Sequence, residues 1–284
     1  MSRRYHSAFR ILGLIGASLI WTVNGLAQVV VSGSFGPNGD VGFANSPMGC
    51  VTGPPCPTIT FGADSQGLIY QMDGFVNASN TDWSGPSTPS GTSRQLTDGP
   101  PTGVGYTFTA VQPTTHQLLL TYQFVNNTAQ TLTNFQFMYY ADPDIGSNFA
   151  DEWATVAGSP GFGLTSYQVS DPTFSSMFTN LDKGTLNNTN EEPITSPGDV
   201  STALGFKLVA LGIGENATFQ VLMSDDLSSI GSLSVTQQDS IYADTLTLSG
   251  RVVTPQPAPE PSSLVLYATG LVLLAVPLGK RYIA

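Results

Sequence analysis

The feature that most constrains the fold is an alternation of large apolar side chains between residues 116 and 145, HQLLLTYQFVNNTAQTLTNFQFMYYADPDI. Such residues occupy every second position in two series, Leu118, Leu120, Tyr122 and Phe124, and then Phe135, Phe137 and Tyr139. Successive side chains of a β-strand point to opposite faces, so this period predicts two strands that each bury one face. The intervening Asn126-Asn127-Thr128 predicts a turn, and the two strands are therefore expected to pair as a hairpin.

Similar patterns recur along the chain and predict an all-β protein. Strands are expected at 28–35, 67–75, 103–111 and 242–253, and a second hairpin is expected over 204–223 with its turn from Gly212 to Asn216. The stretches 37–65 and 77–102 are rich in Gly, Pro, Ser and Thr, which is typical of long loops. Hydrophobic residues make up 40% of the 284 residues, enough for a core, and no linker divides the body. One β domain over 28–253 is predicted.

Two motifs in this body carry a resemblance. The pattern YxFxNNTxxTLTNFxF at 122–137 and the turn LGIGENATF at 211–219 resemble the hairpins of bacterial surface β-sandwich domains of immunoglobulin-like type. The resemblance implies an immunoglobulin-like or jelly-roll-type β-sandwich. It bears on the fold alone, because one fold of this kind carries many functions.

The N-terminal segment 1–27 has the layout of a secretory signal peptide. Three arginines precede an apolar stretch at 11–23, and Gly25 and Ala27 supply the small residues ahead of a cleavage site. Cleavage is expected between Ala27 and Gln28. The alternative is a retained membrane-spanning helix, for which the apolar stretch is short, so export of a cleaved protein is the preferred interpretation.

The protein is acidic, and removal of its terminal segments on export would make its net charge more negative. The whole chain has a net charge of −11, and the stretch 28–260 carries 4 basic and 20 acidic residues. Such a surface repels phosphate backbones, which argues against nucleic-acid partners. It could attract divalent cations, or it could serve to keep a β-rich protein soluble.

The two cysteines of the chain, Cys50 and Cys56, lie in the turn-rich sequence CVTGPPCP. In an oxidising compartment they could close a small disulfide ring that staples a long loop, which is the expected state. A metal site is the weaker alternative, because the sequence has no second cysteine pair and no nearby histidine.

The C-terminal segment 262–284 is predicted to be a transmembrane helix that follows a Pro-rich linker at 254–261. Every residue from 264 to 278 is apolar or small, and Lys280 and Arg281 follow. As a helix these residues extend about 22 Å, so flanking residues would have to complete a span of about 30 Å. The basic pair places the end of the chain in the cytoplasm. A glycolipid-anchor signal is the alternative, but such tails end without basic residues.

Directly before this segment stands Pro259-Glu260-Pro261. This motif, the apolar span and the short basic end, together with the signal peptide, resemble the PEP-CTERM sorting signal of Gram-negative bacteria over residues 259–281. The resemblance implies an exosortase partner that processes the chain near Pro259, Glu260 and Pro261. It also implies transient residence in the inner membrane and delivery to the cell surface or the extracellular matrix of exopolysaccharide-producing species.

The body contains one dense group of carboxylates, in the sequence ADPDIGSNFADEWATV: Asp142, Asp144, Asp151 and Glu152. Ca²⁺ takes six to eight oxygen ligands, which such a loop could supply. The spacing is not that of an EF-hand, and the alternative is a solvated loop whose aspartates form turns. Trp83 and Trp153 could stack on sugar rings if they are exposed, or they could belong to the core.

Signatures of catalysis do not occur in the sequence. His116 is the one histidine after the signal peptide, and no Ser-His-Asp or Cys-His arrangement can be built around it, so a structural or solvent-facing role is expected. Motifs typical of zinc proteases, α/β-hydrolases and phosphate-binding loops are not found.

These observations favour an exported, non-enzymatic surface or matrix protein, structural or adhesive in exopolysaccharide or biofilm. Two alternatives remain open: a calcium-dependent carbohydrate-binding module and, least favoured, a secreted glycoside hydrolase that uses two carboxylates. No cofactor is expected other than Ca²⁺ at the carboxylate group, and the partners would be an exosortase and extracellular polysaccharide.

Overall fold

The computed structural model describes residues 30–32, 35, 38–41, 58–61, 67–88, 91–145, 150–161, 163–172, 176–239 and 244–253. Several predicted features lie outside this part of the chain: the signal peptide with Ala27 and Gln28, the pair Cys50 and Cys56, the motif Pro259, Glu260 and Pro261, and the basic end Lys280 and Arg281. They stay predictions.

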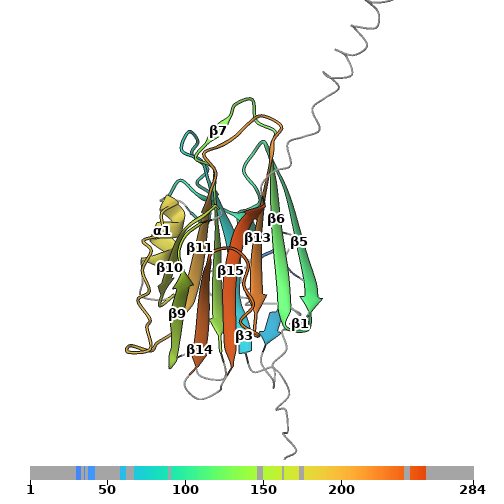
Figure 1. Ribbon diagram of the computed structural model, residues 1–284. Coiled ribbons are helices and arrows are strands. Elements are labelled where there is room, and N and C mark those ends of the chain that lie inside the picture. Colours follow the sequence, from blue (N-terminus) through green and yellow to red (C-terminus); the bar gives the residue numbers. More distant parts are fainter. Residues whose placement is uncertain are drawn as a thin grey trace, which may run out of the picture.

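The described residues form two large antiparallel sheets that face each other (Figure 1). Sheet A has the order β1 (Val30–Ser32), β2 (Thr58–Phe61), β3 (Gly67–Asn77), β8 (Gln136–Asp144), β11 (Ser201–Lys207) and β10 (Leu164–Ser170), and the short β4 (Arg94–Gln95) pairs with β3. Sheet B has the order β5 (Val104–Thr114), β6 (Gln117–Asn126), β13 (Asn216–Ser224), β15 (Thr245–Val253), β14 (Leu233–Asp239) and β9 (Glu152–Gly158). The prediction of an all-β, two-sheet fold is confirmed at this level.

Aromatic side chains fill the space between the two sheets. Tyr122 and Phe124 of β6 and Phe219 of β13 meet Phe137 of β8 and Phe206 of β11, and all five are buried. The Phe137 ring lies at the centre, with its centroid 4.6 Å from that of Tyr122 and 5.2 Å from that of Phe219. The alternating series in the sequence are thus the inner faces of their strands, as predicted.

Both predicted hairpins are wrong in their pairing. β6 lies in sheet B and β8 in sheet A, so the segment between them crosses from one sheet to the other, and β11 and β13 are separated in the same way. The two crossings run side by side, where β7 (Leu132–Thr133) pairs with β12 (Ala210–Leu211). Asn126 does form the predicted turn, because its Oδ1 accepts the Thr128 backbone N–H at 3.0 Å. That turn leads into the crossing rather than into a hairpin.

The strands expected around 28–35, 67–75, 103–111 and 242–253 correspond to β1, β3, β5 and β15. The stretches expected to be long loops contain β2, β4 and the 3₁₀ helix η1 (Leu96–Asp98) as well. β9, β10 and β14 were not predicted: β10 and β14 are rich in Thr, Ser and Gln, and β9 has only small apolar residues after Trp153, so none shows a strong series of large apolar side chains.

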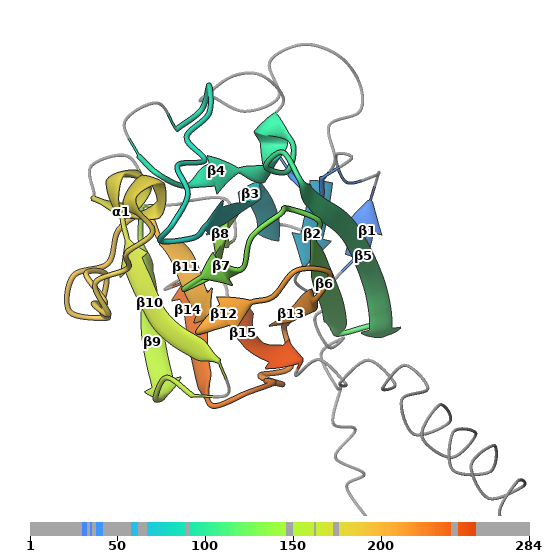
Figure 2. The ribbon, with the colours of Figure 1, turned by 90° about the horizontal axis from the view of Figure 1, so that it is seen from above.

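A short helix, α1 (Met177–Lys183), covers part of the outer face of sheet A (Figure 2). Its buried Met177 and Leu181 pack with Phe75, Met138 and Tyr140 in a second, smaller apolar cluster. The helix ends at Gly184, whose φ of 70° suits glycine. Within the described residues, no helix combines the length and the apolar character needed to cross a membrane.

The chain between α1 and β11 closes one side of the sandwich. β9 and β10, the last strands of sheets B and A, lie at the same side of the molecule (Figure 2). Residues 187–199, here called the strap, form backbone hydrogen bonds with both of these edge strands. The strap thereby brings its last residue, Asp199, to the end of β8.

Candidate metal centre

Two of the predicted carboxylates, Asp142 and Asp144, come from the C-terminal end of β8. Phe137 and Tyr139 point into the main core, and Met138 and Tyr140 point to the outer face under α1. The same alternation continues the outer-facing series to Asp142 and Asp144. β8 lies between β3 and β11, and Asp142 is only 4% exposed.

The third member of the group is Asp199, which the sequence did not reveal. One carboxylate oxygen of each of Asp142, Asp144 and Asp199 lies within 4.8 Å of the others. The register between β11 and β8 reaches as far as the pair Thr202 and Ala141, and Asp199 stands in the strap just before β11, next to Gly198, which is hydrogen-bonded to Glu152. The sequence gives little indication that Asp199 belongs to this group. It is a single Asp shortly before a strand, and its position becomes meaningful only when the neighbouring strand in the sheet is known.

Burial raises the pKa of all three carboxyl groups, and repulsion by neighbouring carboxylates adds to the effect at Asp142 and Asp199. Burial raises the pKa of Asp142 well above its ordinary value, and the charges of Asp199 and Asp144 add to the effect. The pKa of Asp144 rises to about 6 through burial. That of Asp199 rises to about 7, through burial and then through Asp144. A cation between the three groups would oppose these shifts and keep the carboxylates ionised.

One oxygen of Asp142 supplies an independent indication of a ligand. Its Oδ1 is buried and finds no hydrogen-bond donor within the described part of the chain. Asp199 Oδ1 has the same status. Buried polar atoms are nearly always satisfied, so an unsatisfied oxygen on a member of a three-carboxylate group indicates that this group can bind a cation. Among the described residues the ion pair of the protein, His116 with Asp225, lies elsewhere.

Glu152 and Asp151, the other two carboxylates expected to bind Ca²⁺, are not part of this group. The Glu152 side chain is fully buried and accepts hydrogen bonds from the Ile145 backbone N–H and, at 2.6 Å, from Gln237 Nε2. Burial raises its pKa to about 9, so at neutral pH it is a neutral, hydrogen-bonded group that joins β9 to the end of β8. The physical reason is that β9 enters sheet B, which turns Glu152 towards the interior.

The donor set suits a hard divalent cation. Three carboxylates without histidine or cysteine are typical of Ca²⁺ or Mg²⁺ sites rather than of zinc or copper sites. Ca²⁺ accepts irregular geometry and variable ligand number, which fits carboxylates that come from a strand and a loop. A glycosidase, by contrast, needs two acids that can reach a sugar ring, and Asp142 is too deeply buried for that.

The two tryptophans do not form a sugar-stacking surface at this site. Trp83 packs edge-on against the core residue Phe135, with ring centroids 6.2 Å apart. Trp153 lies between the inward-facing Glu152 and Ala154, so it points to the outer side of sheet B, whereas the aspartates stand on the outer side of sheet A. A carbohydrate-binding role through the expected aromatics is therefore not favoured.

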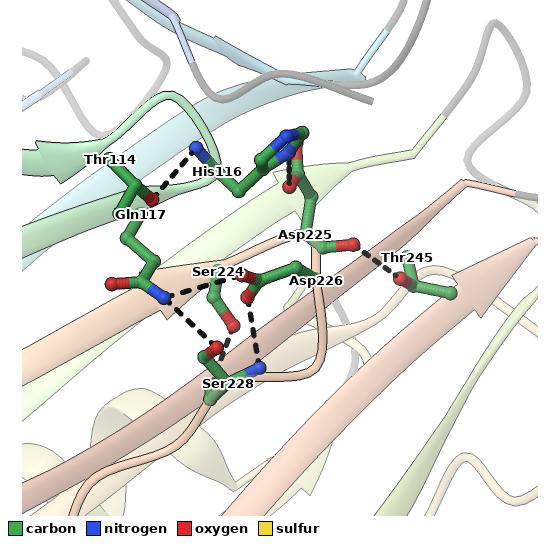
Figure 3. Close-up of polar contacts among 8 residues, drawn as sticks. All are labelled: Thr114, His116, Gln117, Ser224, Asp225, Asp226, Ser228 and Thr245. Carbon is green, nitrogen blue, oxygen red and sulfur yellow. Dashed lines mark hydrogen bonds and ion pairs between the residues drawn. The ribbon is translucent and has the colours of Figure 1, made fainter. Parts of the chain in front are cut away.

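A second polar cluster surrounds the one histidine of the described chain (Figure 3). His116 Nδ1 lies 2.9 Å from Asp225 Oδ1, and the Asp225 side chain is fully buried. Beside them, Gln117 Nε2 donates to Ser228 Oγ at 2.9 Å and to Asp226 Oδ2 at 3.3 Å. These contacts fasten the turn between β5 and β6 to the loop after β13. The site is a structural junction.

The chain matches no family model. No curated protein matches it at a significant level either.

Proposed function

We propose that the protein is an exported, non-enzymatic β-sandwich of immunoglobulin-like or jelly-roll type that binds Ca²⁺ through Asp142, Asp144 and Asp199. The observation that carries the proposal is the buried Oδ1 of Asp142, which lacks a donor among the described residues and belongs to a side chain with an oxygen within 4.8 Å of the carboxylates of Asp144 and Asp199. A bound cation would satisfy that oxygen and offset the repulsion between the three groups.

The extracellular side of a bacterial envelope suits such a site. Three carboxylates give a modest ligand count, and backbone carbonyls or water would complete the six to eight oxygens that Ca²⁺ requires. A site of this kind is filled where free Ca²⁺ is abundant, which agrees with the signal peptide predicted at 1–27. The strongly acidic body adds a long-range attraction for cations.

Calorimetric titration of the purified, metal-free protein with Ca²⁺ tests the proposal. We expect one saturable binding event, with Mg²⁺ binding more weakly because it demands stricter geometry. With Ca²⁺ at about 100 times its Kd, mass action adds about 2.7 kcal/mol to the free energy of unfolding. The absence of both binding heat and a melting shift would refute the calcium site.

Matched variants separate this site from general attraction by an acidic surface. Asp142→Asn keeps the shape of the side chain but removes a charged ligand, so the calcium response should be lost. Asp82→Asn is the control, because Asp82 is exposed and its Oδ1 accepts the Ser84 backbone N–H at 3.1 Å, a contact that an Asn can retain. Asp82→Asn should titrate like the native protein.

We further propose that the C-terminal segment sorts the protein to the cell surface or extracellular matrix, where the body has a structural or adhesive role. Pro259-Glu260-Pro261, the apolar stretch and Lys280-Arg281 support this, on the basis of the sequence. Deletion of 259–284 should release the body into the medium with an unchanged circular dichroism spectrum and melting temperature. Retention of the truncated protein in the membrane fraction would contradict sorting by this segment.

A further inference from the structure

The strap, residues 187–199, is bound to both sheets by main-chain hydrogen bonds. On the side of β10, the Val169 N–H donates to Thr189 O and the Glu191 N–H donates to Val169 O, each at 2.9 Å. On the side of β9, the Ala154 N–H donates to Glu192 O at 2.8 Å. The strap therefore covers the hydrogen-bonding edges of two strands that would otherwise be open.

The far end of the strap is held at one place. Glu152 and Gly198 exchange two backbone hydrogen bonds, of 3.1 and 2.9 Å. The next residue is Asp199, whose carboxylate meets Asp142 and Asp144 of β8. The middle of the strap is exposed from Ile194 to Pro197, so few side-chain contacts help to hold it.

The metal centre therefore joins the strap to the sheet it covers. Two of its carboxylates belong to β8, and the third belongs to the strap. Without a cation, repulsion between ionised Asp144 and Asp199 pushes the end of the strap away from β8. With a cation, the same two side chains are pulled together. The ion thus converts repulsion between the strap and β8 into attraction, at the point where the strap returns to sheet A.

We propose that Ca²⁺ at this centre acts as a latch, which holds the strap closed over the edges of β9 and β10. This inference rests on the proposed calcium site and adds what that site controls. The sandwich would be fully closed only where free Ca²⁺ exceeds the Kd of the site. In the metal-free protein the strap opens while the two sheets remain folded.

Limited proteolysis with a glutamate-specific protease tests the latch, because the sequence supplies a site and an internal control. The described residues contain Glu152, which is fully buried, Glu191 and Glu192 in the strap, and Glu215 in the turn before β13. The bond after Glu192 precedes Pro193 and resists cleavage, so the Glu191–Glu192 bond reports on the strap. The Glu215–Asn216 bond lies in an exposed turn outside the latch.

Intact-mass analysis over time would follow both cleavages, with EDTA and with Ca²⁺. An open state that does not bind the ion is depleted by the factor 1 + [Ca²⁺]/Kd, so Ca²⁺ at about ten times its Kd should slow cleavage after Glu191 about tenfold. Cleavage after Glu215 should keep its rate. In Asp199→Asn the effect of Ca²⁺ on Glu191 should disappear, and the Asp82→Asn control should behave like the native protein.

The possible results separate the latch from the calcium site itself. Calcium binding by calorimetry with an unchanged rate after Glu191 would overturn the latch and leave the proposed function intact. Equal slowing after Glu191 and Glu215 would also overturn it, because the ion would then be stabilising the whole fold. No calcium binding at all would remove the proposed function together with the latch. A circular dichroism spectrum of Asp199→Asn verifies that the variant is folded.

Discussion

Asp199 in the strap and Asp144 at the end of β8 each have a carboxylate oxygen within 4.8 Å of the other, so the fold places two carboxylates close together. Asp142 stands two residues before Asp144 on the same side of β8 and completes the group. Like charges held close together destabilise the folded state unless protons or a cation neutralise them. We therefore expect the stability of the protein to depend on pH and, through the proposed site, on Ca²⁺.

The metal-free protein should become less stable as the pH rises from about 4 to about 7. An unfolded Asp has a pKa of about 3.9, whereas the folded pKa values are about 6 for Asp144 and about 7 for Asp199. Between these limits the folded state binds more protons than the unfolded state, so the free energy of unfolding falls with rising pH. Buried Asp73, with its pKa raised to about 7, contributes in the same direction. Thermal melts in EDTA across this range would measure the slope.

Ca²⁺ should oppose the loss of stability at higher pH. Its own stabilising effect should increase as the pH rises. Protons compete with the cation for the same carboxylates, so Ca²⁺ should raise the melting temperature strongly near pH 7 and little near pH 4. An equal increase in melting temperature with Ca²⁺ at pH 4 and at pH 7 would contradict a site made of Asp142, Asp144 and Asp199. The Asp142→Asn variant should show a flatter pH profile in EDTA, since one of the titrating groups has been removed.

The buried faces of the sandwich could be predicted from the sequence, but the topology could not. Alternation marks Tyr122 and Phe137 as inward-facing because a period of two is a local property of a strand. Their true relation is contact across the interior, at 4.6 Å between ring centroids, rather than hydrogen bonding within one sheet. Strand pairing depends on how the two crossings pack at β7 and β12, which no local pattern encodes.

The difference between local pattern and strand arrangement also explains which carboxylates of the candidate metal centre could be predicted. Asp142 and Asp144 could be found, because residues two apart on a strand share a face. Asp151 and Glu152 are close to them in sequence, but β9 joins the other sheet and carries Glu152 into the interior. Asp199 is distant in sequence and is brought to the group by the strap, whose Gly198 is hydrogen-bonded to Glu152. Proximity along the chain was thus a poor guide to proximity in space.

Gly158 should not tolerate a side chain. Comparison with Gly99 distinguishes a steric clash from backbone strain as the cause. Both Gly158 and Gly99 have a positive φ, of 83° and 84°. A Cβ at Gly158 would lie 2.0 Å from the Ser232 carbonyl oxygen, whereas a Cβ at Gly99 would meet nothing within 4 Å. Gly99, with ψ of 159°, lies in a backbone region that is essentially restricted to glycine, so Gly99→Ala should lose about 1–3 kcal/mol through backbone strain alone, and Gly158→Ala should lose more because of the added clash. Equal losses in urea unfolding would mean that the contact with Ser232 relaxes freely.

The junction of His116 and Asp225 should contribute to stability through the burial of the carboxylate. Burial raises the pKa of Asp225, and the hydrogen bond with His116 partly lowers it again. His116→Ala leaves the buried Asp225 without this partner and should lower the free energy of unfolding by about 1–3 kcal/mol. In an Asp225→Asn background the same change leaves no buried charge without a partner. The decrease in the free energy of unfolding should therefore be smaller.

A double-mutant cycle measured by urea unfolding at pH 7 checks this coupling. The two single variants and the double variant share the same turn and loop, so the difference isolates the interaction between the two side chains. Additive losses would show that the contact at 2.9 Å contributes no coupling and that His116 acts only by packing. Calcium binding should be unaffected in all three variants, because the junction lies on the turn between β5 and β6 and the loop after β13, away from the end of β8 that carries the metal centre.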